Sequence, residues 1–257
     1  MKSFYIYSIQ KDEFFQTITE LFVSLGARIV STIEESEGTI VLGGDGAVLG
    51  ASRSGVRSPM LIINTGHLGF LTSSSKDDYH KAIINFLTGR YTTTKRQMLI
   101  VSQDGEQTYA LNDIVFRKAV LSGLVRLSVY ASQNDQAEVL VSEYRADGLI
   151  VSTPTGSTAY NLSASGPIIH PSCPSLVITP ICPQALTQRP VVLPASFNLR
   201  IEAHTEDMGM SIDGQIEKSL GKGVNIQYNQ HAIETVDPIT SYFEVLRSKM
   251  AWGIRPV

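Results

Sequence analysis

The segment Gly43-Gly44-Asp45-Gly46 constrains the fold of this chain more than any other, because it directly follows the apolar run 39–42. Such a run is typical of a buried strand, and the glycines after it predict a sharp turn with backbone angles that other residues disfavour. Glycines also lack the side chains that would keep a phosphate away from the backbone. The segment therefore predicts a phosphate-sized hollow at the end of a strand.

Asp45 is the acidic residue of this turn. A carboxylate beside a phosphate is unfavourable unless it binds a metal ion or accepts a proton, so the turn indicates phosphoryl transfer to a hydroxyl group. A plain strand-to-helix turn explains the four residues about equally well. A Walker A loop is excluded because no Lys-Ser or Lys-Thr follows, and the spacing of Gly44, Gly46 and Gly50 fits the Rossmann fingerprint only loosely.

Strand and helix patterns alternate over the first 95 residues. Apolar runs predict strands at 4–7, 27–30, 39–42 and 60–63. Helical spacing predicts a helix at 14–25, and a second from Ser75 to Leu87 that Gly89 closes. This alternation predicts an α/β domain with a parallel, doubly wound sheet, whose ligands bind at the carboxyl ends of the strands.

Short β-rich runs follow from about residue 97, which predicts a mostly antiparallel β-sandwich. The runs are 99–102, 108–116, 126–131, 138–141, 148–152, 176–179, 198–203, 224–228 and 232–236. One helix is predicted to start near Ser157, and a last helix at 241–250 is expected to return to the first domain. We therefore predict an α/β domain at 1–95, a β-sandwich domain at 96–238, and a C-terminal helix and tail at 239–257.

The composition of the 257 residues, 43% hydrophobic and 18% charged, allows a sizeable core. The net charge of −3 argues against nucleic acid or an anionic membrane as partner. The two cysteines fit no zinc, redox or disulfide pattern, so a reducing, cytoplasmic location is expected. No signal peptide or membrane-spanning run is expected from the apolar pattern. The five histidines lack metal-binding spacing, so no metal ligand is predicted.

Two further segments carry candidate nucleotide contacts. In the loop 64–71, Phe70 either packs against a planar base or fills the core, and the two are equally consistent with the sequence. Asn112 and Asp113 interrupt an apolar strand, where these residue types are depleted. A carboxylate beside an amide suits the paired hydroxyls of a ribose, and a bulge or turn is the simpler alternative.

The segment 145–167 is the longest polar motif. A predicted strand enters a turn rich in Ser, Thr, Pro and Gly, and a helix then begins. Helix N-termini bind polar and anionic ligands through their N–H groups. Capping by Ser157 or Thr158 is the structural alternative, although one cap needs fewer hydroxyl residues than this run contains.

Taken in order, the glycine-rich turn, the Asn112-Asp113 pair and the run from Asp147 to Ser163 resemble the NAD kinase family, over about residues 39–215. The glycine-rich turn is shared with diacylglycerol, sphingosine and phosphofructokinase relatives, whereas the other two segments are more specific to NAD kinases. The layout of the family, an α/β domain followed by a β-sandwich, agrees with the predicted pattern.

The resemblance implies phosphoryl transfer from ATP, or polyphosphate, to the 2′-hydroxyl of the adenosine ribose of NAD, which makes NADP. Asp45 would accept the hydroxyl proton, and Asn112 and Asp113 would hold ribose hydroxyls. The other implied contacts to NAD or ATP are Gly43, Gly44, Gly46, Phe70 on the adenine side, Arg145, Asp147, Thr158, Ala159, Tyr160, Asn161, Leu162, Ser163 and Gln215. Mg²⁺ or another divalent cation would bridge the phosphates of ATP.

Family members are oligomers, so a homodimer or homotetramer is implied, with Asp147 contacting NAD from its own or a neighbouring subunit. Two positions depart from the family pattern. Gly50 stands where many members carry Lys or Arg, with Arg53 one helical turn on as a substitute, and Gln184 stands where His is common.

Two other functions stay open. One is a lipid kinase of the diacylglycerol or sphingosine type, which would share the glycine-rich turn but would have no use for the hydroxyl-rich run. The other is a non-catalytic dinucleotide-binding regulator, which would bind NAD but release no ADP. Phosphorylation of NAD compared with a lipid alcohol separates the first, and ADP release separates the second.

Overall fold

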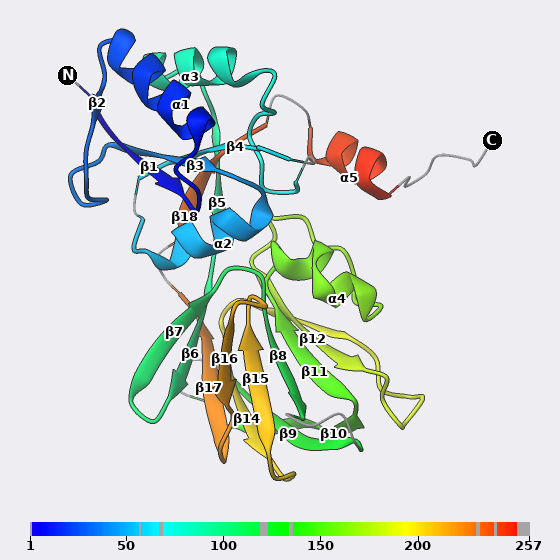
Figure 1. Cartoon of the computed structure of the whole chain (residues 1–257). Helices are drawn as coiled ribbons and strands as arrows, with labels where there is room; N and C mark the ends of the chain where they lie inside the picture. Colours follow the sequence, from blue (N-terminus) through cyan, green and yellow to red (C-terminus); the bar gives the residue numbers. More distant parts are fainter. Residues whose placement is uncertain are drawn as a thin grey trace. The chain divides into compact units, whose positions relative to one another are not determined.

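The structure is a computed structural model that describes residues 2–56, 58–66, 69–118, 123–133, 136–229, 232–238 and 241–250. The chain divides into two compact units. Unit 1 comprises Met1–Thr94 and Ile233–Val257, and unit 2 comprises Lys95–Ala232. The chain therefore leaves unit 1, forms the whole of unit 2, and then returns to unit 1 (Figure 1).

Unit 1 is built around a six-stranded sheet with the strand order β2-β1-β3-β4-β18-β5. The pairs β1–β2, β1–β3, β3–β4 and β4–β18 are parallel. The strands are β1 (Ser3–Ser8), β2 (Arg28–Ile29), β3 (Gly38–Leu42), β4 (Met60–Ile63), β5 (Thr93–Arg96) and β18 (Ile233–Val236). The helices are α1 (Glu13–Ser24), α2 (Asp45–Arg53), α3 (Tyr79–Thr88) and α5 (Tyr242–Met250).

Helices pack on both faces of this sheet. On one face, Ile40 of β3 belongs to a buried cluster with Phe22 of α1 and Ile83 of α3. On the other face, Gly50 of α2 approaches β1 so closely that a Cβ at this position would overlap the Tyr7 hydroxyl. Strands buried on both faces are typical of a doubly wound sheet, and the α/β prediction is confirmed (Figure 1).

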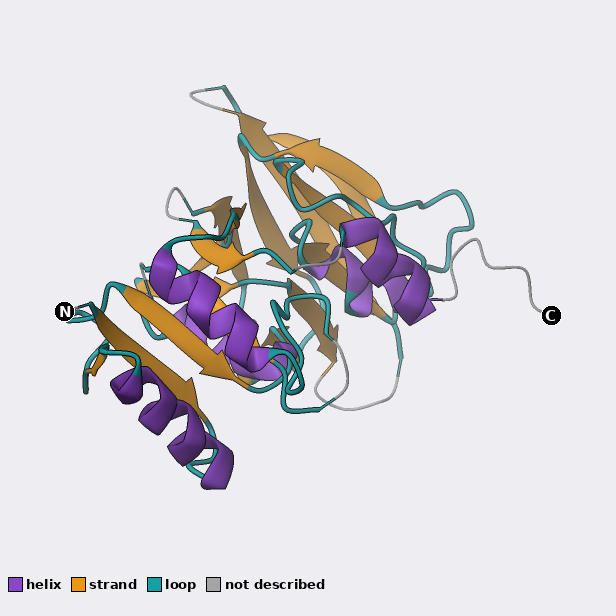
Figure 2. Cartoon of the chain, turned by 90° about the horizontal axis from the view of Figure 1, so that it is seen from above, coloured by secondary structure: helices purple, strands orange, loops and turns teal. Residues whose placement is uncertain are grey.

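Unit 2 is a sandwich of two antiparallel sheets, with the strand orders β10-β9-β14-β17-β6-β7 and β13-β12-β11-β8-β15-β16. Side chains from both sheets, such as Ile201 of β14 and Phe116 of β8, form one buried cluster. Figure 2 shows the strands in orange and the helices in purple.

The first sheet contains β6 (Leu99–Gln103), β7 (Glu106–Ala110), β9 (Val125–Gln133), β10 (Val139–Ala146), β14 (Phe197–Ala203) and β17 (Gly223–Tyr228). The second sheet contains β8 (Asp113–Lys118), β11 (Gly148–Ser152), β12 (Ser175–Ile181), β13 (Val191–Pro194), β15 (Met208–Ile212) and β16 (Ile216–Ser219). The short 3-10 helix η1 (Gly156–Thr158) and helix α4 (Tyr160–Ser163) lie between β11 and β12.

The predicted C-terminal helix is confirmed and belongs to unit 1. Helix α5 begins just after Ser241, whose Oγ accepts the Glu244 N–H at 3.3 Å while Glu244 Oε2 accepts the Ser241 N–H at 2.7 Å. This reciprocal pair is a capping box, which explains where the helix starts. The predicted tail at 251–257 lies outside the described residues. Among the described helices, none is both long and apolar enough to cross a membrane.

Three predicted elements differ from the structure in unit 2. The run 108–116 is not one strand but two, β7 and β8, because the backbone N–H groups of Leu111 and Asn112 bond to the Asp213 carboxylate instead of a neighbouring strand. The helix predicted from Ser157 is reduced to η1 and the four residues of α4. The run 232–236 belongs to the parallel sheet of unit 1, as β18.

Other differences are local. Helix α3 starts at Tyr79 rather than Ser75, because Ser75 and Asp78 first bond to each other through side chain and backbone. Gly89 ends the helix as predicted, with a φ of 72°. Strands β5, β13, β15 and β16 have no counterpart among the predicted runs. Half-buried and exposed residues alternate along β13 and β16, which lie at sheet edges and carry too few buried side chains for a strong apolar signal.

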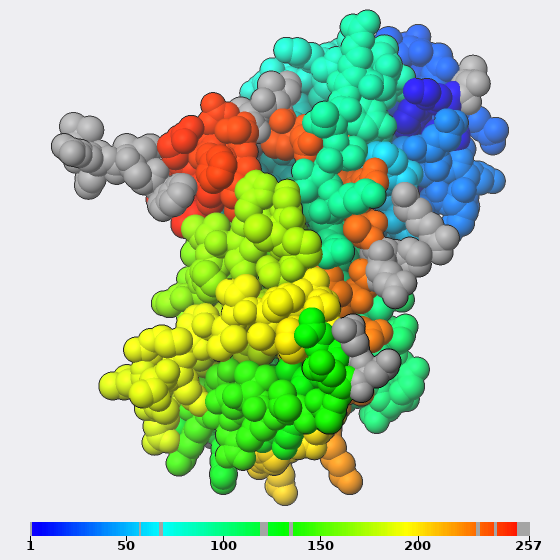
Figure 3. Space-filling view, turned by 180° about the vertical axis from the view of Figure 1, so that it is seen from behind, coloured from blue at the N-terminus to red at the C-terminus, as the bar shows by residue number. Residues whose placement is uncertain are grey.

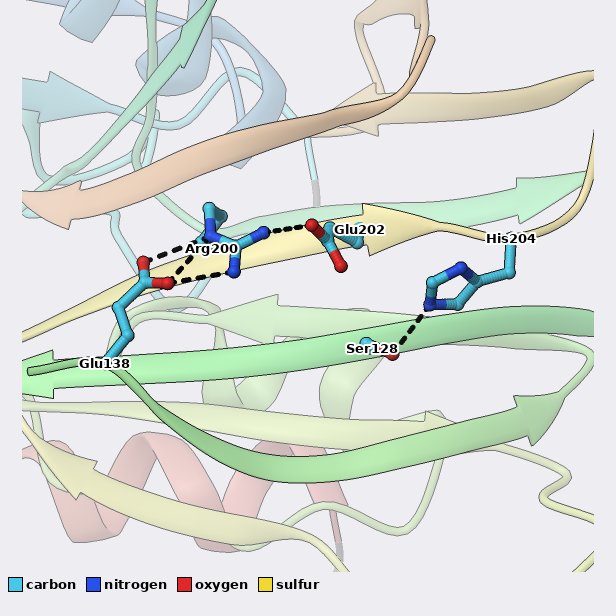
Figure 4. A network of polar contacts seen from close by, with 5 residues as sticks. All are labelled: Ser128, Glu138, Arg200, Glu202 and His204. Carbon is cyan, nitrogen blue, oxygen red and sulfur yellow. Dashed lines mark hydrogen bonds and ion pairs between the residues drawn. The ribbon is translucent and has the colours of Figure 1, made fainter.

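A polar network lies on the face of β9 and β14 that points away from the core (Figure 4). Arg200 Nε donates to both carboxylate oxygens of Glu138, and the guanidinium also pairs with Glu202 and lies 4.1 Å from the centre of the Tyr130 ring. This network ties neighbouring strands together on an exposed surface.

Candidate functional site

The glycine-rich turn connects β3 to α2. Gly43 has a φ of 142°, and a Cβ on it would lie 2.7 Å from the Cβ of Ala47, so this position requires glycine. Gly44 is the N-cap of α2, brings no side-chain cap and has open space where a Cβ would be. The partial positive charge at the N-terminus of α2 favours a phosphate in that space.

Asp45 is the first residue of α2 and is half-buried. Its Oδ2 accepts the Phe70 N–H at 3.0 Å, and its Oδ1 accepts the Leu71 N–H at 3.1 Å. Gly69 permits this approach, because a Cβ there would overlap the carboxylate. The structure thus brings together the two loops predicted separately, at 43–46 and 64–71, and fixes both oxygens of the candidate base.

Phe70 is half-buried in this loop, and the Lys249 Nζ of α5 lies 5.5 Å from the centre of its ring. A cation over an aromatic face is attractive, so the C-terminal helix contributes to the surroundings of the predicted adenine-side residue. His67 and Leu68 of the same loop lie outside the described residues.

Unit 2 contains a cavity of about 300 Å³. It is lined by Asn112, Asp113, Val115, Arg117, Ala159, Tyr160, Ser211, Asp213, Gly214 and Glu217. The structure therefore joins the predicted ribose pair with Ala159 and Tyr160, which come from the hydroxyl-rich segment. A cavity at the lower end of ligand-pocket sizes suits one part of a dinucleotide, such as a sugar.

Asp113 is buried at the start of β8. Burial is the main reason why the pKa of Asp113 is raised to about 7, and the negative charge of Asp213 raises it further. The hydrogen bond from the Tyr160 N–H lowers this pKa and offsets part of the increase. At neutral pH this carboxyl group is therefore divided between its protonated and charged forms. A protonated carboxyl group can both donate a hydrogen bond to a hydroxyl group and accept one from it.

The hydroxyl-rich segment uses much of its polarity to hold its own turn. Asn161 is fully buried, donates to the carbonyl oxygens of Ser157 and Pro167, and accepts the Thr179 hydroxyl at 2.7 Å. Asn161 is thus part of the framework that carries Ala159 and Tyr160. Thr158 and Leu162 are half-buried and Ser163 is exposed, and none of the three lines the cavity.

Arg145 and Asp147 are exposed and lie outside the cavity lining. Their backbones bond to the end of β12 and to the segment that follows it: Asp147 N–H donates to the Ile181 carbonyl at 2.9 Å, and Gln184 N–H donates to the Arg145 carbonyl at 2.8 Å. On the face shown in Figure 3, the green surface around residues 125–150 adjoins the yellow surface around residues 180–200. Gln215 is also exposed, in the turn before β16.

Two residues near the candidate groups have no counterpart in the sequence prediction, Asp213 and Lys249. The dipeptide Asp213-Gly214 between two apolar runs is a typical hairpin turn signal, and it could have revealed β15 and β16. Nothing in the sequence pattern links Lys249 to Phe70, because their contact depends on the return of the chain to unit 1.

The glycine-rich turn with Asp45 in unit 1 and the polar cavity in unit 2 indicate a class of protein, the nucleotide-binding phosphotransferases. Comparison with known proteins narrows the class to a family. A model of the ATP-NAD kinase N-terminal domain matches residues 31–91, and a model of the ATP-NAD kinase C-terminal domain matches residues 111–236. The NAD kinase of Geobacter sulfurreducens is 40% identical over 228 residues, which cover 84% of this chain and 78% of that protein. The chain belongs to the NAD kinase family, and the resemblance seen in the sequence is confirmed.

Two solved structures share the fold. The yeast NADH kinase complexed with NADH superposes with a TM-score of 0.84 at 21% identity, covering 100% of this chain and 89% of that one. The NAD kinase from Archaeoglobus fulgidus in complex with ATP gives a TM-score of 0.81 at 22% identity, covering 96% and 97%. At these identities the likeness establishes the fold alone.

Proposed function

We propose that this chain transfers a phosphoryl group from ATP to the 2′-hydroxyl of the adenosine ribose of NAD, which forms NADP. The observation that carries the proposal is the setting of Asp45. Its carboxylate is fixed by two N–H groups, at a turn without bulky side chains, at the carboxyl end of a parallel strand. Such a group suits proton removal next to a phosphate.

Asp45 acts in this proposal as the general base. A ribose hydroxyl is a poor nucleophile at neutral pH, and a positioned carboxylate that takes its proton typically gives about 10²–10⁴-fold acceleration. The N–H groups of Phe70 and Leu71 orient the carboxylate without needing to move during the reaction. Phosphoryl transfer otherwise depends mainly on alignment and charge stabilisation, since it offers the protein little covalent chemistry.

Asn112 and Asp113 bind ribose hydroxyls in the proposal. Both line the cavity in unit 2, together with Ala159 and Tyr160, and this shared lining supports the assignment. Phe70 would lie on the adenine side. We assign secondary contacts with NAD to Thr158, Leu162, Ser163, Arg145, Asp147 and Gln215, which are half-buried or exposed.

A divalent cation, Mg²⁺ by preference, would accompany ATP and neutralise charge on its phosphates. Among the described residues there is no group of three or more His, Cys, Asp and Glu side chains that could hold a metal ion. In the proposal the ion is held mainly by substrate phosphates, because Mg²⁺ commonly takes only one or two carboxylates from the protein.

We also propose a cytoplasmic homodimer or homotetramer with no nucleic-acid or membrane partner. Cys173 and Cys182 are both free thiols, and the net charge is −3. Strands β10 and β13 end their sheets and expose Val139, Leu140 and Val192, which supports an interface between copies because such edges otherwise invite aggregation. Light scattering coupled to size-exclusion chromatography measures the oligomer directly.

The test of the function is an assay that follows the formation of NADP from NAD, or of NADPH from NADH, with ATP or polyphosphate as donor. We expect NADP from NAD and Mg-ATP. Phosphorylation of a lipid alcohol in place of NAD would establish the lipid-kinase alternative. Calorimetric binding of NAD without ADP release in the presence of Mg-ATP would establish a non-catalytic regulator.

A further inference from the structure

Asp213 forms an unusual set of contacts for a turn residue. It follows β15, has a φ of 52°, and is buried to 7% exposure. Its Oδ2 accepts the Leu111 N–H at 3.0 Å, and its Oδ1 accepts the N–H groups of Asn112 and Asp113 at 2.7 and 3.3 Å. Its own N–H donates to the Asp113 carbonyl at 2.9 Å. One carboxylate thus gathers three successive N–H groups of a segment about 100 residues away in the chain.

These bonds create the corner between β7 and β8. Three successive N–H groups that converge on one anion cannot also take part in a regular strand ladder, so the strand pattern breaks at Leu111 and Asn112. The carbonyl side of the corner is held as well, because Thr153 N–H donates to the Asn112 carbonyl at 2.9 Å. A Cβ on Gly156 would overlap the same carbonyl. The corner is therefore clamped from both sides, and it carries the two residues proposed to hold the ribose.

The same carboxylate acts on Asp113 through its charge. Both residues line the cavity, and the charge of Asp213 adds to burial in raising the pKa of Asp113. The other charged residues of the lining, Arg117 and Glu217, are exposed. They form an ion pair with 3.2 Å between Arg117 Nη2 and Glu217 Oε1. Tyr160, on α4, faces Asp113 with its backbone N–H. Asp213 is therefore the charged group whose removal should change the titration of Asp113.

We propose that Asp213 is a positioning residue of the nucleotide site: its carboxylate fixes the Leu111–Asn112–Asp113 corner and thereby the geometry with which Asn112 and Asp113 meet a ribose. The inference rests on the proposed function, since it concerns the binding of NAD. Asp213 acts through the corner and not by contact with the reacting atoms.

The experiment compares Asp213→Asn with a matched control, Asp207→Asn, in the full-length enzyme. Asp207 stands at the other end of β15 with a φ of 54° and is exposed, so both changes remove one negative charge from a turn residue in the same backbone region. Asparagine tolerates this region, and the backbone needs no rearrangement in either variant. NAD affinity by calorimetry, the KM for NAD and kcat are measured across pH.

We expect Asp213→Asn to weaken NAD binding and raise the KM by about 10- to 100-fold, by analogy with the loss of groups that orient metal ligands, with kcat changed about threefold or less. The pH at which NAD affinity changes should move downward, because Asp113 loses the charge that raises its pKa. Asp207→Asn should leave all four quantities unchanged. A folded Asp213→Asn enzyme with wild-type affinity and an unmoved pH midpoint overturns the inference.

A second measurement on the unaltered enzyme covers the case in which Asp213→Asn does not fold. Hydrogen exchange should show the amides of Leu111, Asn112 and Asp113 protected like those of β8, although the first two lie outside any strand. Exchange at free-peptide rates overturns the inference. If the wild-type enzyme forms no NADP, the proposed function fails, whereas the protection of these amides still tests the clamp by itself.

Discussion

In the proposed function each unit contributes one carboxylate to nucleotide chemistry, and the two carboxylates lie in contrasting surroundings. Asp45 in unit 1 is half-buried at a helix N-terminus, and each of its oxygens accepts one N–H. Asp113 in unit 2 is buried, lies close to a second carboxylate, and has a pKa raised to about 7. The accessible carboxylate suits proton transfer from a substrate, whereas the enclosed one suits a hydroxyl-binding role in which it shares a proton.

Both carboxylates depend on support from distant parts of the chain. The loop containing Gly69 and Phe70 fixes Asp45, and the turn containing Asp213 fixes the corner that carries Asp113. In each case the bonds run between a carboxylate and backbone N–H groups, which hold their positions better than flexible side chains do. The contrast therefore predicts different outcomes when each carboxylate, or its support, is changed.

The largest effect is expected for Asp45→Asn. The amide cannot accept the ribose proton, so kcat should fall by at least about 10²-fold while NAD still binds. Steady-state kinetics measure the fall, and calorimetry with NAD provides the control. Turnover near the wild-type value would remove Asp45 from the role of base and with it the contrast between the two carboxylates.

Gly69→Ala should give the next largest effect. The new Cβ would overlap the Asp45 carboxylate and push it out of its bonds with Phe70 and Leu71, and a displacement of this size can cost about 10²-fold in kcat. Gly66→Ala is the matched control, since the nearest atom to a Cβ there is 4.0 Å away. Equal kinetics for the two variants would show that the loop does not position the base.

The sequence draws attention to the residues of the candidate site but not to the long-range bonds that hold them. The turn at Asp45 and the pair Asn112-Asp113 stand out because glycines and polar residues there contradict the pattern of their strands. Asp213 does not stand out, since an Asp-Gly turn is ordinary in a hairpin and its bonds run to a segment about 100 residues earlier. Periodicity describes neighbours along the chain, and such long-range bonds leave no periodic trace.

The same limit explains the errors in the fold. Burial patterns located most strands, but they could not tell that β18 pairs in parallel with β4 of unit 1, because partner choice depends on tertiary structure. Asn161 is predicted to contact NAD from its place in the hydroxyl-rich segment. In the structure its buried amide also bonds to the turn that carries Ala159 and Tyr160, a role that the motif does not reveal.

Asp113 should also make the free energy of unfolding depend on pH. Its pKa of about 7 in the folded state exceeds the ordinary value of 3.8, so between these pH values the folded state retains a proton that the unfolded chain has lost. Stability should therefore fall as pH rises through this window, by at most about 1.4 kcal/mol per pH unit, and level off above it.

Asp113→Asn removes this titration, so the free energy of unfolding of the variant should fall less as the pH rises. Denaturant unfolding of both proteins at about pH 5 and about pH 8 gives the comparison, with other titrating groups common to both. If the free energies of unfolding of wild type and variant differ by the same amount at both pH values, Asp113 titrates normally. Its surroundings would then not differ from those of Asp45 in the way described.

The smallest effect is expected away from both the Asp45 turn and the cavity in unit 2, for Arg200→Gln on the exposed face of β14. The change removes ion pairs with Glu138 and Glu202 and the stacking on Tyr130, all partly solvated (Figure 4). Such contacts contribute little, so the free energy of unfolding should fall by about 1 kcal/mol, with kcat and the KM for NAD unchanged. Equilibrium unfolding and steady-state kinetics measure both. A large kinetic loss here would show that polar networks in unit 2 act on the nucleotide site without lining its cavity, and the separation of binding from framework residues would need revision.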